Sequence, residues 1–168
     1  MNYKIEIYAD GRKNDKGVGS GFAIFIDGNL TFQLRFKLAD KCSNNQAEQL
    51  AIAKVLEKVK DLQVHRNQRT LAIHTDSRMT LEAIANQRNR QNLIELIRKE
   101  IRCLENNSWI VHFAWAKAHN SNSGNELADQ LAKEAVCDGE LDIAYNTYSK
   151  SAVISELKEL GLRKWQSE

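Results

Sequence analysis

Hydrophobic and polar residues alternate at the start of the chain. Over residues 3–10 an apolar or aromatic side chain occupies every second position from Tyr3 to Ala9, the period of a strand with one buried face. Gly11 interrupts this pattern. The polar, glycine-rich stretch 12–21 that follows predicts a loop without the Gly-Lys-Ser/Thr ending of a phosphate-binding loop.

Two further strands are predicted next, over residues 22–26 and about 30–38. Asp27-Gly28-Asn29 separates them and favours a tight hairpin turn, since Asp and Gly accept the positive φ angles that such turns require. Three consecutive strands joined in this way predict an antiparallel meander.

Downstream, the apolar residues recur at helical spacing. This spacing predicts four helices, over residues 47–60, 78–86, 93–104 and 125–137. Short apolar runs predict strands at 71–75 and 109–115, and the second run places Trp109 and Trp115 in the core. The tail predicts a short helix over 152–160 that ends at Gly161.

This order of elements predicts an α/β fold. Strand–helix–strand units favour parallel neighbours joined by right-handed crossovers. The expected architecture is a mixed five-stranded sheet, three antiparallel strands and then two parallel ones, with helices packed on it. We expect one domain over residues 1–140, followed by a C-terminal tail, 141–168, with no second domain.

Composition narrows the cellular setting. The 168 residues carry a net charge of +2, contain no proline and include three widely spaced cysteines. The cysteines form no pair typical of a zinc site or disulfide framework, so a reducing compartment is expected. No signal peptide or membrane-length apolar run is evident. We therefore expect an intracellular protein, cytoplasmic or nuclear, that is not secreted and has no membrane partner.

Four acidic residues occupy notable positions in these elements. Asp10 ends the first strand, Asp76 ends the fourth, Glu48 is expected in the first turn of a helix, and Asp129 lies in the last predicted helix. Each has a purely structural interpretation. Asp10 with Gly11 is a common turn pair, Glu48 would suit a helix dipole, and Asp76 could cap the following helix.

Taken together, the four acids favour chemistry over structure. If the first and fourth strands are parallel neighbours, Asp10 and Asp76 leave the sheet at the same edge, about one strand spacing apart. Clustered carboxylates repel one another unless cations are present, and hard divalent ions prefer oxygen ligands. Two such ions, roughly 4 Å apart, would activate a water and stabilise the leaving oxygen of a phosphodiester.

Four short motifs also resemble type 1 ribonuclease H, in that family's order. They are Tyr8-Ala9-Asp10-Gly11, Asn44-Asn45-Gln46-Ala47-Glu48, His74-Thr75-Asp76-Ser77 and His119 followed by Asn125-Glu126-Leu127-Ala128-Asp129. The resemblance covers residues 3 to about 138. It implies a ribonuclease H-like fold and an endoribonuclease that cuts the RNA strand of RNA–DNA hybrids, leaving 5′-phosphate and 3′-hydroxyl ends.

The resemblance also implies roles for individual residues. Asp10, Glu48, Asp76 and Asp129 match the carboxylates that hold two Mg²⁺ ions, for which Mn²⁺ would substitute, and His119 matches a loop histidine that assists proton transfer or product release. Glu126 matches a supporting acid near the site. Hybrid-binding positions correspond to Asn44, Asn45 and Gln46, with Asn14 as a further contact. Asparagine suits this role because it both donates and accepts hydrogen bonds.

The chain departs from the family in two places. Asn120 stands where a glycine usually follows the loop histidine, although Asn tolerates positive φ better than most residues. A basic protrusion common in bacterial members is reduced to residues 86–92, where Arg88 and Arg90 are the cations. Because phosphate contacts supply most hybrid affinity, we expect weak binding by the isolated, monomeric domain.

Retroelement ribonuclease H domains often lack the protrusion and work beside a linked reverse transcriptase. The tail segments Ser149-Lys150-Ser151-Ala152 and Arg163-Lys164-Trp165-Gln166 look like sequence that follows ribonuclease H in non-LTR retrotransposon polyproteins. The resemblance therefore implies a domain that acts during reverse transcription, with Met1 and Glu168 bounding a segment of a longer polyprotein.

Two other functions remain possible at this point. A degenerate domain of this fold could bind nucleic acid without cutting it, although the presence of all four acids argues against this. An integrase or junction resolvase of the same superfold would prefer DNA, whereas the Asn44-Asn45 pair and His119 favour an RNA–DNA hybrid.

Overall fold

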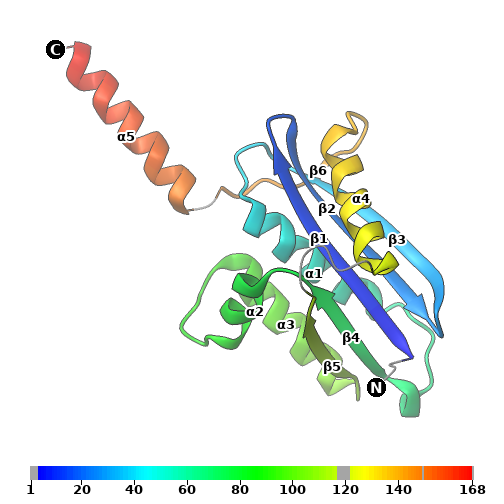
Figure 1. Cartoon of the computed structure of the whole chain (residues 1–168). Helices are drawn as coiled ribbons and strands as arrows, with labels where there is room; N and C mark the ends of the chain where they lie inside the picture. Colours follow the sequence, from blue (N-terminus) through cyan, green and yellow to red (C-terminus); the bar gives the residue numbers. More distant parts are fainter. Residues whose placement is uncertain (1–3, 117–121, 149, 168) are drawn as a thin grey trace.

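The computed structural model describes residues 4–116, 122–148 and 150–167, and in these ranges six strands form one mixed sheet (Figure 1). The strand order is β5-β4-β1-β2-β3-β6. The strands are β1 (Ile5–Asn14), β2 (Gly17–Ile26), β3 (Asn29–Leu38), β4 (Thr70–Thr75), β5 (Ile110–Trp115) and β6 (Ile143–Tyr145). β1, β2 and β3 form the predicted antiparallel meander, and β4 lies parallel to both β1 and β5.

Helices cover both faces of this sheet. The helices of the described residues are α1 (Asn44–Val59), α2 (Arg78–Ala85), α3 (Asn92–Asn106), α4 (Ser123–Cys137) and α5 (Lys150–Ser167), with a short 3₁₀ turn at Arg66–Gln68. α1 packs against β1 and β2, with α3 behind it, while α4 crosses β1, β2 and β3. Figure 1 shows α4 in front of the sheet and α1 behind it.

Side-chain alternation on paired strands explains the two layers. Gly11 is paired with Ser20 and faces α1, where the Ser20 hydroxyl donates a 2.6 Å hydrogen bond to the Ala47 carbonyl. The neighbouring pairs, Asp10 with Gly21 and Arg12 with Gly19, face the other way, toward α4. This alternation assigns Asp10 and Arg12 to the same face of β1.

The prediction of a loop over residues 12–21 was wrong. β1 continues to Asn14 and β2 already begins at Gly17, so this stretch is a long hairpin. The glycines are there because α4 lies close to the strand. A Cβ at position 19 would be 2.4 Å from the Ala132 carbonyl oxygen, and one at position 21 would be 2.6 Å from the Leu131 Cβ.

The hydrophobic core lies mainly between the sheet and α1. Ile5, Ile7 and Ala9 on β1 contact a cluster that includes Ala51 and Val55 of α1. Trp109 is buried in this cluster, as predicted, whereas Trp115 is 51% exposed, so its predicted core position was wrong. Trp115 is the last residue of β5, an edge strand in which no residue is fully buried.

The tail contains more structure than the hydrophobic pattern predicted. β6 adds a sixth strand parallel to β3, so the prediction of five strands was wrong; three residues that pair through their backbone produce no detectable alternation. The helix expected over 152–160 is instead α5, which runs from Lys150 to Ser167 without a break at Gly161. One glycine costs about 1 kcal/mol in a helix, which does not end a run flanked by good helix formers.

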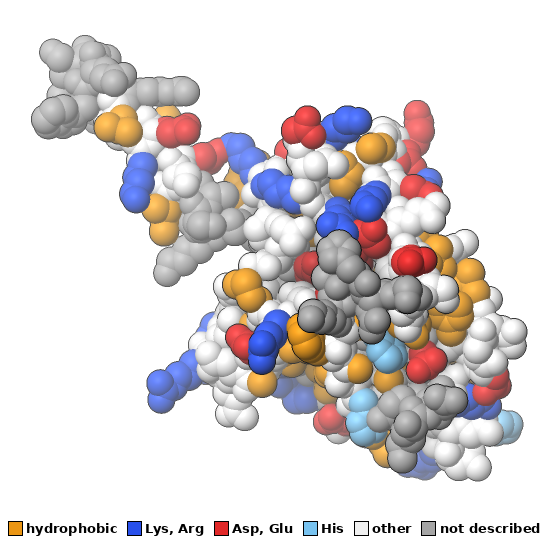
Figure 2. Space-filling view, viewed as in Figure 1, with side chains coloured by type: hydrophobic (Ala, Val, Ile, Leu, Met, Phe, Trp, Pro, Cys, Tyr) orange, Lys and Arg blue, Asp and Glu red, His pale blue; other side chains and the backbone are white. Residues whose placement is uncertain are grey.

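α5 projects away from the rest of the molecule (Figure 1), and hydrophobic side chains lie on its surface (Figure 2). Val153, Leu157 and Leu160 are exposed there. None of the helices in the described ranges is both long and apolar enough to cross a lipid bilayer.

Candidate active site

Three of the predicted acids meet at one edge of the sheet. Asp10, Glu48 and Asp76 each offer a carboxylate oxygen, and these oxygens all lie within 4.8 Å of one another. Asp10 is on β1, and Asp76 directly follows β4, the parallel neighbour of β1. The pairing inferred from the strand–helix–strand order therefore delivers both carboxylates to the same place.

Glu48 reaches the cluster from α1, on the second turn of the helix. The sequence predicted Glu48 in the first turn, but the helix begins at Asn44, so this prediction was wrong. The interpretation of Glu48 as a favourable charge at the helix end therefore loses support. Ser43 caps the helix: its hydroxyl accepts from the Gln46 amide at 3.1 Å, and the Gln46 side chain accepts from the Ser43 amide at 2.9 Å. This reciprocal capping box defines where α1 starts and hence where Glu48 projects.

Burial makes this cluster unstable as a set of bare anions. Asp10 is 7% exposed and Glu48 is 6% exposed. Desolvation and the nearby Asp76 charge raise the pKa of Asp10 to about 7. Desolvation, together with the charges of Asp10 and Asp76 and a hydrogen bond with Asp10, raises the pKa of Glu48 still further.

The cluster fits divalent cations. The Oε2 atom of Glu48 is buried and has no hydrogen-bond partner, although buried polar atoms are normally satisfied. The donors are carboxylate oxygens from three separate segments, the ligand type that Mg²⁺ and Mn²⁺ prefer. A bound cation would provide the missing partner and would offset the mutual repulsion of the acids.

Asp129 is held differently from the other three acids. It lies on α4, where Lys133 contacts its Oδ2 at 2.7 Å and the Arg12 guanidinium contacts its Oδ1. Desolvation alone would raise the pKa of Asp129, but the hydrogen bonds from Lys133 and Arg12 hold it below its usual value. Asp129 therefore stands beside the three-acid cluster, engaged by two cations.

Arg12 is the residue that the sequence pattern did not reveal. Its Nε lies 4.0 Å from Oδ2 of Asp10, while the same guanidinium contacts Asp129. Figure 2 shows acidic and basic side chains side by side over β1 and α4. The only available signal was that Arg12 follows Asp10 by two residues and so shares its face of the strand, but the expected loop over 12–21 concealed this relationship.

Of the predicted residues of the last motif, Glu126 lies within the described part of the chain and His119 does not. Glu126 lies exposed in the first turn of α4, on the helix that carries Asp129. His119 and Asn120 lie outside the residues that the structure describes. Nearby, the described residue Asn122 caps α4 by accepting from the Gly124 amide at 2.8 Å.

The predicted hybrid-binding residues lie at the start of α1 and at the end of β1. Asn44 is exposed as the first residue of α1, and the Asn45 amide lies 3.9 Å from the Met79 sulfur. The Gln46 side chain is engaged in the helix cap and also donates to the Thr147 carbonyl at 2.9 Å. Asn14 accepts from the Lys16 amide at 2.7 Å, a contact that shapes the hairpin turn.

A groove of about 860 Å³ runs beside these residues. Its walls come from the start of α1, from α2, from the connection between α2 and α3, and from the tail. Many of its lining side chains are amides or aromatics: Asn45, Gln46, Gln49, Asn86, Asn89, Gln91, Asn92, Tyr145 and Tyr148.

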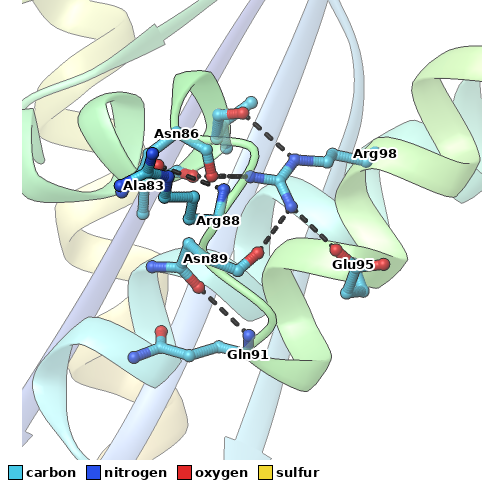
Figure 3. A network of polar contacts seen from close by, with 8 residues as sticks. Ala83, Asn86, Arg88, Asn89, Gln91, Glu95 and Arg98 are labelled. Carbon is cyan, nitrogen blue, oxygen red and sulfur yellow. Dashed lines mark hydrogen bonds and ion pairs between the residues drawn. The ribbon is translucent and has the colours of Figure 1, made fainter.

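Arg98 organises the wall formed by the α2–α3 connection (Figure 3). From α3, its guanidinium donates to the carbonyls of Ala83 at 2.9 Å and Asn89 at 2.6 Å, and it pairs with Glu95 at 2.8 Å. It also contacts the Asn86 carbonyl. The short α2–α3 connection is therefore tied down by a partly buried network, while Arg88 and Arg90 remain exposed.

Trp115 is a second residue whose position was not foreseen. Its indole Nε1 donates to the backbone carbonyl of Asp76 at 3.3 Å. The Arg78 guanidinium lies 5.6 Å from the centre of its ring, within the range of a cation–π contact. This exposed pair flanks Asp76 on the side of β5.

Comparisons with known proteins agree with this geometry. A family model described as RNase H matches residues 2–137. The curated ribonuclease H of Nitrosomonas eutropha is 27% identical over 149 residues, covering 79% of this chain and 90% of that protein. The Pol polyprotein of Equine infectious anemia virus is 33% identical over 132 residues, covering 77% of this chain but only 10% of the polyprotein.

Among solved structures, LC11-RNase H1 in complex with an RNA/DNA hybrid superimposes with a TM-score of 0.60. The match covers 79% of this chain and 99% of that one at 19% sequence identity. At this identity the likeness concerns the fold.

Proposed function

Because this chain belongs to the ribonuclease H family and is a ribonuclease H, we propose that it is an endoribonuclease that hydrolyses the RNA strand of RNA–DNA hybrids by two-metal-ion catalysis. The products are 5′-phosphate and 3′-hydroxyl ends. The observation that carries the proposal is the convergence of Asp10, Glu48 and Asp76, whose oxygens lie within 4.8 Å of one another although they come from three separate segments of the chain.

The residues that hold the cations are Asp10, Glu48 and Asp76, with Asp129 as the fourth carboxylate. When bound, two Mg²⁺ or Mn²⁺ ions supply activation of the attacking water and stabilisation of the leaving oxygen. The unpartnered Oε2 of Glu48 and the raised pKa values of Asp10 and Glu48 support this assignment, because a cation favours the ionised form of each carboxyl.

The protein orients these acids through its backbone. The Gly11 amide donates to Oδ1 of Asp10 at 2.8 Å and so fixes the orientation of this carboxylate. The capping box of α1 orients Glu48, and the Trp115 indole holds the backbone of Asp76. His119 is proposed to move a proton during turnover or to assist product release, and Glu126 is proposed to support the exchange of ions and product.

The hybrid is proposed to bind along the start of α1 and the adjoining groove. Asn44 and Asn45, with Gln46, contact base edges and the RNA 2′-hydroxyl, the group that distinguishes RNA from DNA. Asn14 adds a contact from the end of β1, beside the hairpin turn. The likeness in fold to LC11-RNase H1, a structure solved with an RNA/DNA hybrid, supports a hybrid as the ligand.

The biological setting is proposed to be reverse transcription of a retroelement, with the domain linked to a reverse transcriptase in a longer polyprotein. The similarity to the Equine infectious anemia virus Pol polyprotein supports this setting. The α2–α3 connection also supports it, because this segment is short, with Arg88 and Arg90 as its cations, and retroelement ribonuclease H domains often lack the basic protrusion. The isolated domain should then bind hybrid weakly, and fusion to a reverse transcriptase should lower the KM for hybrid while kcat changes little.

One assay tests the proposed activity against its two rivals. The protein is incubated with labelled RNA–DNA hybrid, double-stranded RNA and double-stranded DNA, in Mg²⁺, Mn²⁺ or EDTA, with Asp76→Asn as the inactive control. We expect cleavage of the RNA strand of the hybrid alone, only with metal, and 5′-phosphate ends on the products. Hybrid binding without cleavage under any metal condition would identify a binding module, and equal cleavage of duplex DNA would identify a DNA nuclease.

A further inference from the structure

Arg12 connects two of the four active-site acids. Its guanidinium contacts Oδ1 of Asp129, and its Nε lies 4.0 Å from Oδ2 of Asp10. The Arg12 side chain is 45% exposed, so it is not locked in place by packing. One positively charged group therefore lies between a carboxylate on β1 and a carboxylate on α4.

The position of Arg12 follows from the strand register. Arg12 is paired with Gly19, and Gly19 is pressed against the backbone of α4. Cross-strand partners share a face of the sheet, so Arg12 projects toward α4 and Asp129. Asp10, two residues earlier on β1, lies on the same face.

Both oxygens of Asp129 are engaged. Oδ1 is contacted by Arg12, and Oδ2 lies 2.7 Å from the Lys133 ammonium. Lys133 is one turn further along the same helix, with a side chain that is 59% exposed, so water can readily replace it. A cation that takes Asp129 as a ligand must compete with at least one of these two contacts, and Arg12 is the one that also faces Asp10.

Resting on the proposed function, we propose that Arg12 is a resident counter-ion of the metal-free active site and a competitor of the ion that uses Asp129. In the metal-free enzyme Arg12 screens the repulsion among the acids. When the ion binds, Arg12 gives up Asp129. The residue thereby sets how much free Mg²⁺ the enzyme needs, and it acts on the reaction through the metal site rather than by touching the substrate.

The test measures metal binding directly. Mg²⁺ and Mn²⁺ are titrated calorimetrically into metal-free wild type, Arg12→Gln and Arg12→Ala, without nucleic acid. Arg12→Gln retains most of the side-chain length but removes the charge. Arg102→Ala is the matched control, because it removes an exposed arginine from α3, which contributes nothing to the acid cluster.

We expect the dissociation constant of the ion at Asp129 to fall roughly two- to fivefold in both Arg12 variants, the factor that corresponds to about 0.4–1 kcal/mol for a partly exposed ion pair. The melting temperature in EDTA should fall in the same variants, and the stabilisation gained on adding Mg²⁺ should increase. Arg102→Ala should match the wild type in metal affinity.

A purely structural link between β1 and α4 would give a different result. It would lower the melting temperature to the same extent with and without metal and leave the dissociation constant unchanged or higher, which would overturn the role of Arg12. If metal-free wild type takes up no divalent ion, the metal assignment in the proposed function is wrong, and the role of Arg12 falls with it.

Discussion

Gly11 lies directly against the backbone of Glu48. A Cβ at position 11 would be 2.3 Å from the Glu48 amide nitrogen and 2.5 Å from the Ala47 carbonyl carbon. The strand that carries Asp10 and the helix that carries Glu48 are therefore in backbone contact, one residue after Asp10 and at Glu48 itself. This contact is what brings an acid from β1 and an acid from α1 into one cluster.

Gly11→Ala should consequently separate the two acids. The methyl group meets backbone atoms that cannot move aside, so we expect destabilisation of about 1–3 kcal/mol or more and a large loss of hybrid cleavage. Urea unfolding and a cleavage assay measure the two effects. Gly139→Ala is the control, because a Cβ there meets nothing within 4 Å; equal behaviour of the two variants would contradict the assigned contact.

Asp10→Asn should abolish cleavage and stabilise the metal-free protein. The substitution removes one buried negative charge that Asp76 and Glu48 repel, while it keeps the shape of the side chain. We expect a higher melting temperature in EDTA and a smaller increase on adding Mg²⁺. Asp142→Asn, an exposed change of the same kind, should alter neither quantity. Wild-type activity in Asp10→Asn would show that the metal assignment is wrong.

The stability of the metal-free protein should fall as pH rises. Because the folded state holds the pKa of Asp10 at about 7, well above its usual 3.8, the folded protein binds this proton more tightly than the unfolded chain does. The resulting stability is complete below about pH 4 and is lost as the pH rises to about 7. Between pH 5 and 7 the loss is on the order of a few kcal/mol, since one pKa unit corresponds to about 1.36 kcal/mol.

Urea unfolding in EDTA at pH 5, 6, 7 and 8 measures this slope. Asp10→Asn should show a shallower slope, because it has lost one of the two carboxyl groups with a raised pKa. Saturating Mg²⁺ should reduce the slope of the wild type. A wild-type stability that rose from pH 5 to 8 in EDTA would contradict the proposed environment of Asp10.

Ser43→Ala should weaken the start of α1. It removes the hydroxyl that accepts from the Gln46 amide, and the loss of such a cap costs about 1 kcal/mol, or about 2–4 °C in melting temperature for a chain of this size. Because Glu48 is close to this end of the helix, cleavage should also slow. Ser43→Thr, which can form the same capping box, should restore both quantities; if it did not, the cap would not be the cause.

His119→Ala should slow turnover without abolishing it. Proton transfer by a positioned side chain typically contributes roughly 10²–10⁴-fold, and a role in product release would reduce kcat less than the removal of a metal ligand would. Comparison of single-turnover and steady-state rates separates these possibilities. Complete loss of cleavage, equal to that of Asp76→Asn, would place His119 in the metal-binding machinery instead.

Local pattern was enough to predict most of the elements. Alternation in β1 and helical spacing in α1 and α3 reflect one buried face each, and this burial is recorded directly in the order of residues. The hairpin turn at Asp27-Gly28 was equally local, and both residues adopt the positive φ angles that such a turn requires. The convergence of Asp10 and Asp76 followed from the expected parallel pairing of their strands.

The errors occurred where the reason for a residue lies elsewhere in the chain. Gly19 and Gly21 were taken for loop residues, although they are glycines because α4 packs against β2. β6 is defined by its pairing with β3, and Trp115 is exposed at the end of β5, which lies at the opposite edge of the sheet. Periodicity contains no information about such long-range packing.

The sequence by itself determined the order of the elements and the identity of the acids, because strand and helix periods and short motifs depend on neighbours along the chain. Only the tertiary structure decided how those acids are held. It showed that Asp10, Glu48 and Asp76 share one cluster, while Arg12 and Lys133 engage Asp129. Coulombic and desolvation effects depend on distance and burial in three dimensions, so the charge balance of the site could not be deduced before β1 and α4 were seen together.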